Sequence, residues 1–124
     1  MSLRAAILGL MLILPTGLAA QQQAQDVSVG TGAVLRGLDK INGTSVDLTL
    51  AAGESGSLGK LEVTLHECRY PSEDAAADAF AFLEVQDPNS DTPIFEGWMI
   101  ATSPALNAME HARYDVWVLR CRTE

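Results

Sequence analysis

Three residues whose types could form a hydrolytic site occur near the end of the chain, namely Ser103, His111 and Asp115. In a Ser-His-Asp site the histidine accepts the serine proton, and the acid binds the other ring nitrogen. Ser103 precedes a proline, however, and this arrangement is typical of a residue that caps a helical turn. The chain also contains no G-x-S-x-G elbow. We therefore expect a structural His111 that bonds Asp115 or a loop carbonyl, and we keep a small hydrolase as an alternative.

A calcium loop is the second candidate for chemistry. Asp87, Asn89 and Asp91 have the spacing of its first three ligands. The pattern then fails, because Thr92 stands where glycine is required and Trp98 stands where the bidentate glutamate belongs. A turn between strands explains these residues better, and we expect neither a metal nor another cofactor.

The chain contains two cysteines, Cys68 and Cys121. In an exported protein an even number of cysteines indicates disulfides, and two cysteines allow only one intramolecular pair. A catalytic thiol beside His66 or His111 is the alternative, but it leaves the second cysteine without a role. We predict the Cys68–Cys121 disulfide. Strict alternation along residues 61–66 would place Cys68 on the polar face, so the disulfide requires a bulge or a twist near that strand end.

Aromatic residues supply the remaining candidates for a binding site. Trp98, Tyr114 and Trp117 lie on the two runs that surround the Ser-Pro segment. Aromatic side chains on alternating strands are usually part of the core, and we expect a core cluster here. The alternative is an open platform for sugars or peptide, and an exposed ring would favour it. The possible binding residues are therefore these three together with His111 and Asp115.

The elements that must position these residues are short runs in which apolar and polar side chains alternate, a pattern typical of half-buried strands. Such runs with short loops predict an all-β fold, either an antiparallel β-sandwich or a small β-barrel. The long crossover helices of a parallel sheet are absent from the pattern. The runs cover about residues 33–41, 46–50, 61–66, 79–85, 94–101 and 114–122.

Local signals predict how these runs are connected. Asn42-Gly43 indicates a hairpin, since both turn positions favour residues that tolerate positive φ. The glycines and serines of residues 51–59 indicate a loop. A short helical turn is expected near residues 104–110, with Leu106 and Met109 on one side of it. The final run is apolar on both faces, so we predict a central strand.

Residues 1–20 have the order of a secretory signal peptide: a basic start, an apolar run and an end in small residues. Residues 21–32 are polar and predict a flexible leader, which leaves residues 33–124 as a single β domain. We expect a periplasmic or secreted monomer that is not stably inserted in a membrane after cleavage. The formal net charge of -8 disfavours nucleic acid and anionic membranes as partners.

Several motifs together resemble a known family. They are Val-Leu-Arg-Gly-Leu-Asp-Lys from residue 34, Cys-Arg-Tyr-Pro from residue 68, Phe-Glu-Gly-Trp-Met from residue 95, Ser-Pro-Ala-Leu-Asn-Ala from residue 103, Glu-His at 110–111 and Tyr-Asp-Val-Trp-Val-Leu from residue 114. Over about residues 33–122 the chain resembles the small secreted alphaproteobacterial proteins called DUF2155, a domain of unknown function. Ala112 departs from the Pro that we expect this family to favour after the histidine. The resemblance implies secretion and a compact domain, and it implies no reaction.

These observations lead to three functional hypotheses. The first is a non-enzymatic periplasmic or secreted domain that binds a cell-envelope component or a protein partner. The second is an acidic inhibitor of a secreted cationic enzyme, motivated by the net charge and the loop at residues 54–59. The third is the small hydrolase that would use Ser103, His111 and Asp115.

Cleavage of the signal peptide yields the first testable prediction. The mature protein should begin at Ala20 or Gln21, because the small residues of a cleavage site end there. The intact mass of the exported protein measures this directly. An exported species that retains Arg4 would contradict the secretion hypothesis.

Overall fold

The computed structural model describes residues 9, 12–13 and 26–124. The predicted signal peptide, residues 1–20, lies outside the described residues except at those first three positions. Residues 21–25 of the predicted leader lie outside them as well. Within the described ranges, no helix is both long enough and apolar enough to cross a membrane.

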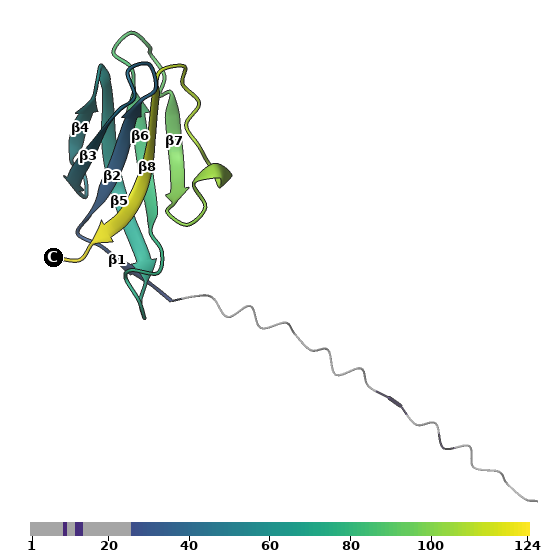
Figure 1. Cartoon of the computed structure of the whole chain (residues 1–124). Helices are drawn as coiled ribbons and strands as arrows, with labels where there is room; N and C mark the ends of the chain where they lie inside the picture. Colours follow the sequence, from purple (N-terminus) through teal and green to yellow (C-terminus); the bar gives the residue numbers. More distant parts are fainter. Residues whose placement is uncertain (1–8, 10–11, 14–25) are drawn as a thin grey trace, which may run out of the picture.

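The fold consists of two antiparallel β-sheets and one short 3-10 turn, η1 (Figure 1). The elements are β1 (Val27–Val29), β2 (Gly32–Asp39), β3 (Thr44–Ala51), β4 (Ser55–Leu58), β5 (Leu61–Pro71), β6 (Phe80–Gln86), β7 (Phe95–Ile100), η1 (Pro104–Leu106) and β8 (Tyr114–Arg122). The five-stranded sheet has the order β1-β5-β6-β7, with β4 also paired to β5, and the three-stranded sheet has the order β3-β2-β8. The predicted all-β antiparallel fold is confirmed. The described strands form a β-sandwich and do not close into a barrel.

The core lies between the two sheets and follows from the alternation along the strands. On β5 the side chains of Leu61, Val63 and Leu65 are buried, as the pattern of this strand predicts. The largest side chains that are completely buried come from both sheets: Leu35, Val63, Leu65, Leu83, Val85, Val116 and Val118, with Cys68. Burial of these residues is the main force that holds the sheets together.

Two connections differ from the sequence-based expectations. The Asn42-Gly43 hairpin forms, but its loop has four residues, and of these only Gly43 has a positive φ, of 69°. The predicted loop at residues 51–59 contains strand β4, because Leu58 is buried over Gly37 and anchors the segment. Gly59, with φ of 58°, then turns the chain tightly into β5.

The predicted flexible leader also contains a strand in its described part. β1 pairs with the end of β5, with Ser28 opposite Tyr70. The Gly30 N–H donates to the Cys68 carbonyl at 2.7 Å, and the Thr31 N–H donates to the Arg122 carbonyl at 2.8 Å. These tertiary hydrogen bonds order a polar segment that has little apolar surface of its own.

The strand-turn-strand prediction for residues 94–121 is confirmed, with two changes in detail. Ser103 makes no side-chain capping bond, and its carbonyl instead accepts the Leu106 N–H at 3.1 Å. The turn ends at Leu106, so helical spacing does not extend to Met109. Met109 is buried and Leu106 is 74% exposed, which makes the prediction that they share a side wrong.

β8 is an edge strand of its sheet, not a central one. Its inner face is buried through Tyr114, Val116 and Val118. Its outer face carries Trp117, which lines a 280 Å³ cavity together with Pro104 and Ala105 from the segment after β7. Apolar residues occur on both faces of β8 because a loop covers the outer face. The sequence of this edge strand therefore resembles that of a central strand, and the prediction of a central strand was wrong.

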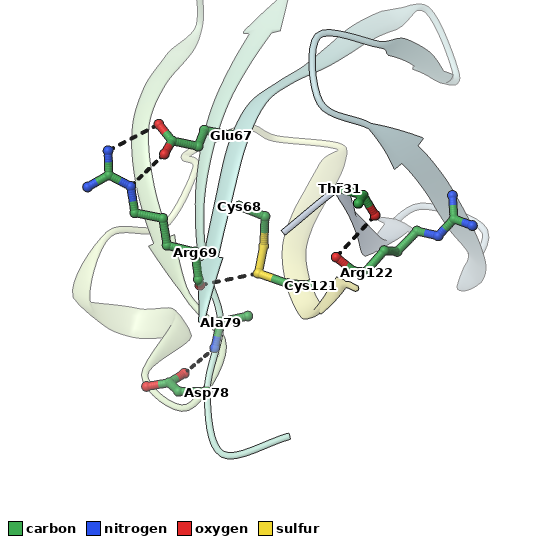
Figure 2. Close-up of a disulfide and its surroundings, with 8 residues drawn as sticks. All are labelled: Thr31, Glu67, Cys68, Arg69, Asp78, Ala79, Cys121 and Arg122. Atoms are coloured by element: carbon green, nitrogen blue, oxygen red, sulfur yellow. Dashed lines mark hydrogen bonds and ion pairs between the residues drawn. A yellow bond between two sulfur atoms is a disulfide. The ribbon is translucent and has the colours of Figure 1, made fainter. Parts of the chain in front are cut away.

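The disulfide between Cys68 and Cys121 forms, as predicted, with a Cα–Cα distance of 5.6 Å. It joins β5 of one sheet to β8 of the other across the core (Figure 2). The pairing of β5 with β6 shifts between Leu65 and Glu67, and this irregularity turns Cys68 inward. The expected bulge is therefore present.

Reduction of this disulfide should destabilise the domain. The cysteines are 53 residues apart, and closing such a loop stabilises the folded state by about 4 kcal/mol in the chain-entropy model. We expect Cys68→Ser and Cys121→Ser to lower the free energy of unfolding by about 2–5 kcal/mol. Each single variant should match the double variant, because either change removes the one bond.

Urea denaturation measures these losses, and thiol labelling of the unreduced protein provides the control. Two reactive thiols in the native protein would contradict the prediction. So would a double variant that is clearly less stable than both single variants.

Candidate functional site

The three aromatic residues singled out from the sequence do not form one cluster. Tyr114 belongs to the core and is 7% exposed. Trp117 is half-buried on the outer face of the three-stranded sheet. Trp98 is 37% exposed and lies on β7, in the other sheet. Their separation leaves Trp98 as the exposed ring that the binding alternative requires.

Trp98 belongs to an exposed apolar surface on the outer face of the five-stranded sheet. Its neighbours come from four strands, and those on β5, β6 and β7 are adjacent to buried residues. We call this surface the platform, and it consists of Val27 on β1, Arg69 on β5, Phe80 and Phe82 on β6, and Trp98 and Ile100 on β7. Sheet register brings these residues together.

Strand pairing places the platform side chains in two rows. Phe82 lies directly opposite Trp98, and Phe80 lies opposite both Ile100 and Arg69. The ring centroids of Phe82 and Trp98 are 5.3 Å apart, with an interplanar angle of 59°. Tilted aromatic pairs of this kind are favourable beyond the area that they bury.

Asn107 fixes the backbone at the edge of the platform. Its side-chain Nδ2 donates to the Trp98 carbonyl at 2.9 Å. Gly97 permits this approach, since a Cβ at that position would lie 2.7 Å from the same nitrogen. The Trp98 carbonyl thus points toward the open edge of β7, where Asn107 is its hydrogen-bond donor.

Arg69 contributes to the platform through its stem and its stacked guanidinium group. Its Nε donates to Glu67 Oε1 at 2.6 Å, and its Cζ lies 5.1 Å from the centre of the Trp98 ring. Figure 2 shows the Glu67 and Arg69 side chains together on the side of β5 away from the disulfide. Hydrogen bonds from Arg69 lower the pKa of Glu67. The pair offsets both charges, and the stacked group adds a cation–π contact.

A shallow groove of 320 Å³ crosses the platform. Val27, Arg69, Phe80, Trp98 and Ile100 line it. Four of these five side chains are apolar, and the fifth is already bonded to Glu67. Exposed apolar surface of this kind, next to polar residues, is typical of interaction sites.

Next to the platform, the same face of the sheet becomes acidic. Glu84 and Glu96 lie directly opposite each other on β6 and β7, one row beyond Phe82 and Trp98. Hydrogen bonds from Gln86 and, to a smaller extent, from His66 lower the pKa of Glu84. The His66 ring also lies 5.5 Å from Phe82, so it joins the aromatic row to the acidic end.

His111 forms a structural corner before β8. Its Nδ1 accepts the backbone N–H groups of Arg113 and Tyr114, each at 3.0 Å. The prediction that His111 bonds Asp115 or a loop carbonyl is therefore wrong. The His111 carbonyl in turn accepts the Lys40 ammonium group at 2.5 Å, which ties the corner to the β2–β3 loop.

An ion pair fixes the other side of this corner. Arg113 donates to Asp39 Oδ2 through Nη2 at 2.9 Å and through Nε at 3.1 Å. The hydrogen bonds from Arg113 lower the pKa of Asp39, whose side chain is only 13% exposed. The carboxylate stays charged and holds the start of β8 against the end of β2.

The structure does not assemble the Ser-His-Asp arrangement. The ring nitrogen of His111 that would face the acid already accepts two backbone N–H groups. Asp115 Oδ1 accepts the Val116 N–H at 2.9 Å. Among the side-chain hydrogen bonds of residues 26–124, none joins Ser103, His111 and Asp115 to one another.

The acidic stretch after β6 forms a turn. Asp87 Oδ1 accepts the Asn89 N–H at 2.9 Å, and the Asp87 carbonyl accepts the Ser90 N–H at 2.9 Å. Across the residues that the structure describes, no three His, Cys, Asp or Glu side chains are grouped in a way that could hold a metal ion.

Sequence reasoning missed most of the platform. The sequence predicts a strand that contains Phe80 and Phe82 but does not distinguish its two faces, because the alternating residues Ala81 and Leu83 are also apolar. Size is the signal that could have separated the faces. The small Ala81 is buried against the core, and the large phenylalanine rings point outward.

The fold and the platform define a small disulfide-bonded β-sandwich with an exposed aromatic face. The chain belongs to the DUF2155 family, described as uncharacterized proteins conserved in bacteria, whose model matches residues 33–121. It is 29% identical over 94 residues to an uncharacterized protein of Rickettsia prowazekii (strain Madrid E), and the match covers 73% of this chain. The chain spans 61% of the length of that relative. No solved structure matches.

Substitution of His111 tests its structural role. His111→Ala leaves the amides of Arg113 and Tyr114 without their acceptor, so the free energy of unfolding should fall by about 1–3 kcal/mol. His111→Asn is the matched control, because an asparagine oxygen accepts nearby backbone N–H groups in turns. It should retain most of the stability in urea denaturation. Equal losses in both variants would contradict the role assigned to Nδ1.

Proposed function

We propose that this domain acts outside the cytoplasm as a non-enzymatic binding module, and that the platform is its contact surface for a protein partner. The observation that carries the proposal is the exposure of Trp98 at the end of a row of aromatic side chains that also contains Phe82 and His66. Tryptophan, tyrosine and arginine dominate the binding energy of protein interfaces. Trp98 and Arg69 are in contact on this surface.

Two features support a location outside the cytoplasm. The first is the predicted signal peptide. The second is the Cys68–Cys121 pair, since disulfides persist in oxidising compartments such as the periplasm. The two features agree, because the cytosol keeps thiols reduced and a disulfide is therefore expected in an exported chain.

The chemistry of the groove favours a protein over a glycan. A sugar requires several polar groups placed around the ring on which it stacks. Here the one polar side chain in the groove, Arg69, already bonds Glu67. An apolar side chain of a protein partner would fill the groove without leaving polar groups unpaired.

The other two hypotheses lack a comparable feature. The loop that motivated an inhibitor is largely strand β4, which pairs with β5 from Ser55 to Leu58. Of the residues that motivated a hydrolase, His111 and Asp115 are engaged in separate local hydrogen bonds. The binding module is therefore the function that the geometry supports best.

Site-specific photo-crosslinking in the native host tests the proposal. A photoreactive residue replaces Val29, which is 64% exposed and pairs with Arg69 beside the platform. The matched control replaces Ile41, which is 73% exposed on the β2–β3 loop. We expect a discrete protein adduct from position 29 and none from position 41.

Trp98→Ala in the position-29 protein should lower the yield of that adduct about tenfold or more, as expected for a hot-spot residue. Thermal unfolding should show that this variant remains folded, because Trp98 lies outside the core. Identical adducts from both positions, or an adduct that Trp98→Ala leaves unchanged, would refute the platform as the contact surface.

A further inference from the structure

The face of the sheet that carries the platform has two chemically different halves. Trp98 and Phe82 end the apolar half, and Glu96 and Glu84 occupy the next outward positions on the same strands. Two residues along a strand span about 7 Å. An apolar contact site and a pair of carboxylates therefore lie next to each other on one rigid surface.

The two carboxylates have different environments. Glu84 accepts hydrogen bonds from His66 Nε2 at 3.0 Å and from Gln86. Glu96 is exposed and makes no ion pair within residues 26–124. Like charges directly opposite each other on neighbouring strands are unfavourable. A cationic group above this pair would remove the repulsion and would find Glu96 free to bind.

The wider field of the protein favours the same kind of partner. The chain carries a formal net charge of -8, and the cation on this face, Arg69, is paired with Glu67. Such a field attracts cationic partners and repels anionic ones, including anionic lipid surfaces. The charge pattern thus complements a basic segment that also offers an apolar side chain.

We propose that the platform recognises a cationic, amphipathic polypeptide segment. An apolar side chain of the segment fills the groove beside Trp98, and a lysine or arginine about 7 Å away contacts Glu96 and Glu84. Side chains two residues apart on an extended segment have this spacing. This inference rests on the platform being the binding surface, and it adds the class of partner.

Three synthetic peptides with blocked ends test the inference by NMR titration of the labelled mature protein. The first probe is Gly-Lys-Ser-Phe-Ser-Lys-Gly, which places a lysine two residues away on each side of phenylalanine. In the second, glutamate replaces both lysines, and in the third, serine replaces phenylalanine. We expect saturable shifts of the Trp98 indole N–H only with the first peptide, and weaker binding at high ionic strength.

Variants of the protein separate the two parts of the site. Trp98→Ala should abolish binding of the first peptide, measured through the backbone amide of Phe82, which lies opposite position 98 and replaces the lost indole signal. Glu96→Gln should weaken it roughly two- to fivefold, the range expected for an exposed ion pair. Glu110→Gln is the matched control, since Glu110 is also exposed but lies on the loop before β8, and it should have no effect.

The outcomes distinguish this inference from the proposed function. If Trp98→Ala abolishes binding but the glutamate peptide binds as well as the lysine peptide, the platform stands and the cationic requirement is wrong. If the serine peptide binds as well as the phenylalanine peptide, the apolar requirement is wrong. Absence of any saturable shift at about 10 mM peptide overturns the inference as a whole, while the crosslinking result continues to test the platform by itself.

Discussion

One irregularity in β5 determines both the core and the outer face of this domain. Up to Leu65 the strand alternates strictly, and its register with β6 then shifts by one residue before Glu67. Without the shift, Cys68 would point to solvent and Arg69 would point into the core, where an unpaired charge is costly. With it, Cys68 reaches Cys121 and Arg69 reaches Trp98. The stacked cation on the platform depends on this shift, and the covalent link depends on it together with the register shift between β2 and β8 near Leu119, which turns Cys121 inward.

The two faces of the five-stranded sheet differ in their surroundings. The inner face is apolar throughout and is joined to the other sheet by burial and by the disulfide. Strand pairing fixes the positions of the outer-face residues, so the aromatic rings keep a fixed arrangement without support from a second layer. A rigid surface of this kind loses little conformational entropy on binding. The corner formed by His111 and by the Asp39–Arg113 ion pair stabilises the opposite sheet and leaves the platform free.

Much of the fold follows from local patterns, and the rest depends on tertiary contacts. Alternation predicted the strand around Val63, and the cysteine count predicted the disulfide. β4 was missed because its glycine and serines have weak strand propensity, and the burial of Leu58 over Gly37 decides its pairing. The platform was missed because β6 is apolar on both faces. Period-two alternation separates the two faces of such a strand but does not say which of them is buried.

The hydrogen bond from Asn107 to the Trp98 carbonyl also affects how the molecule resists self-association. β7 ends its sheet, and an open strand edge next to exposed aromatic rings is a template for cross-β stacking between copies. Asn107 occupies a carbonyl that an incoming strand would need, at the position where the apolar surface reaches that edge. Contact is thereby directed to the face of the sheet. The exposed aromatic rings of the platform therefore meet the sheet edge at a point where one backbone acceptor is already occupied.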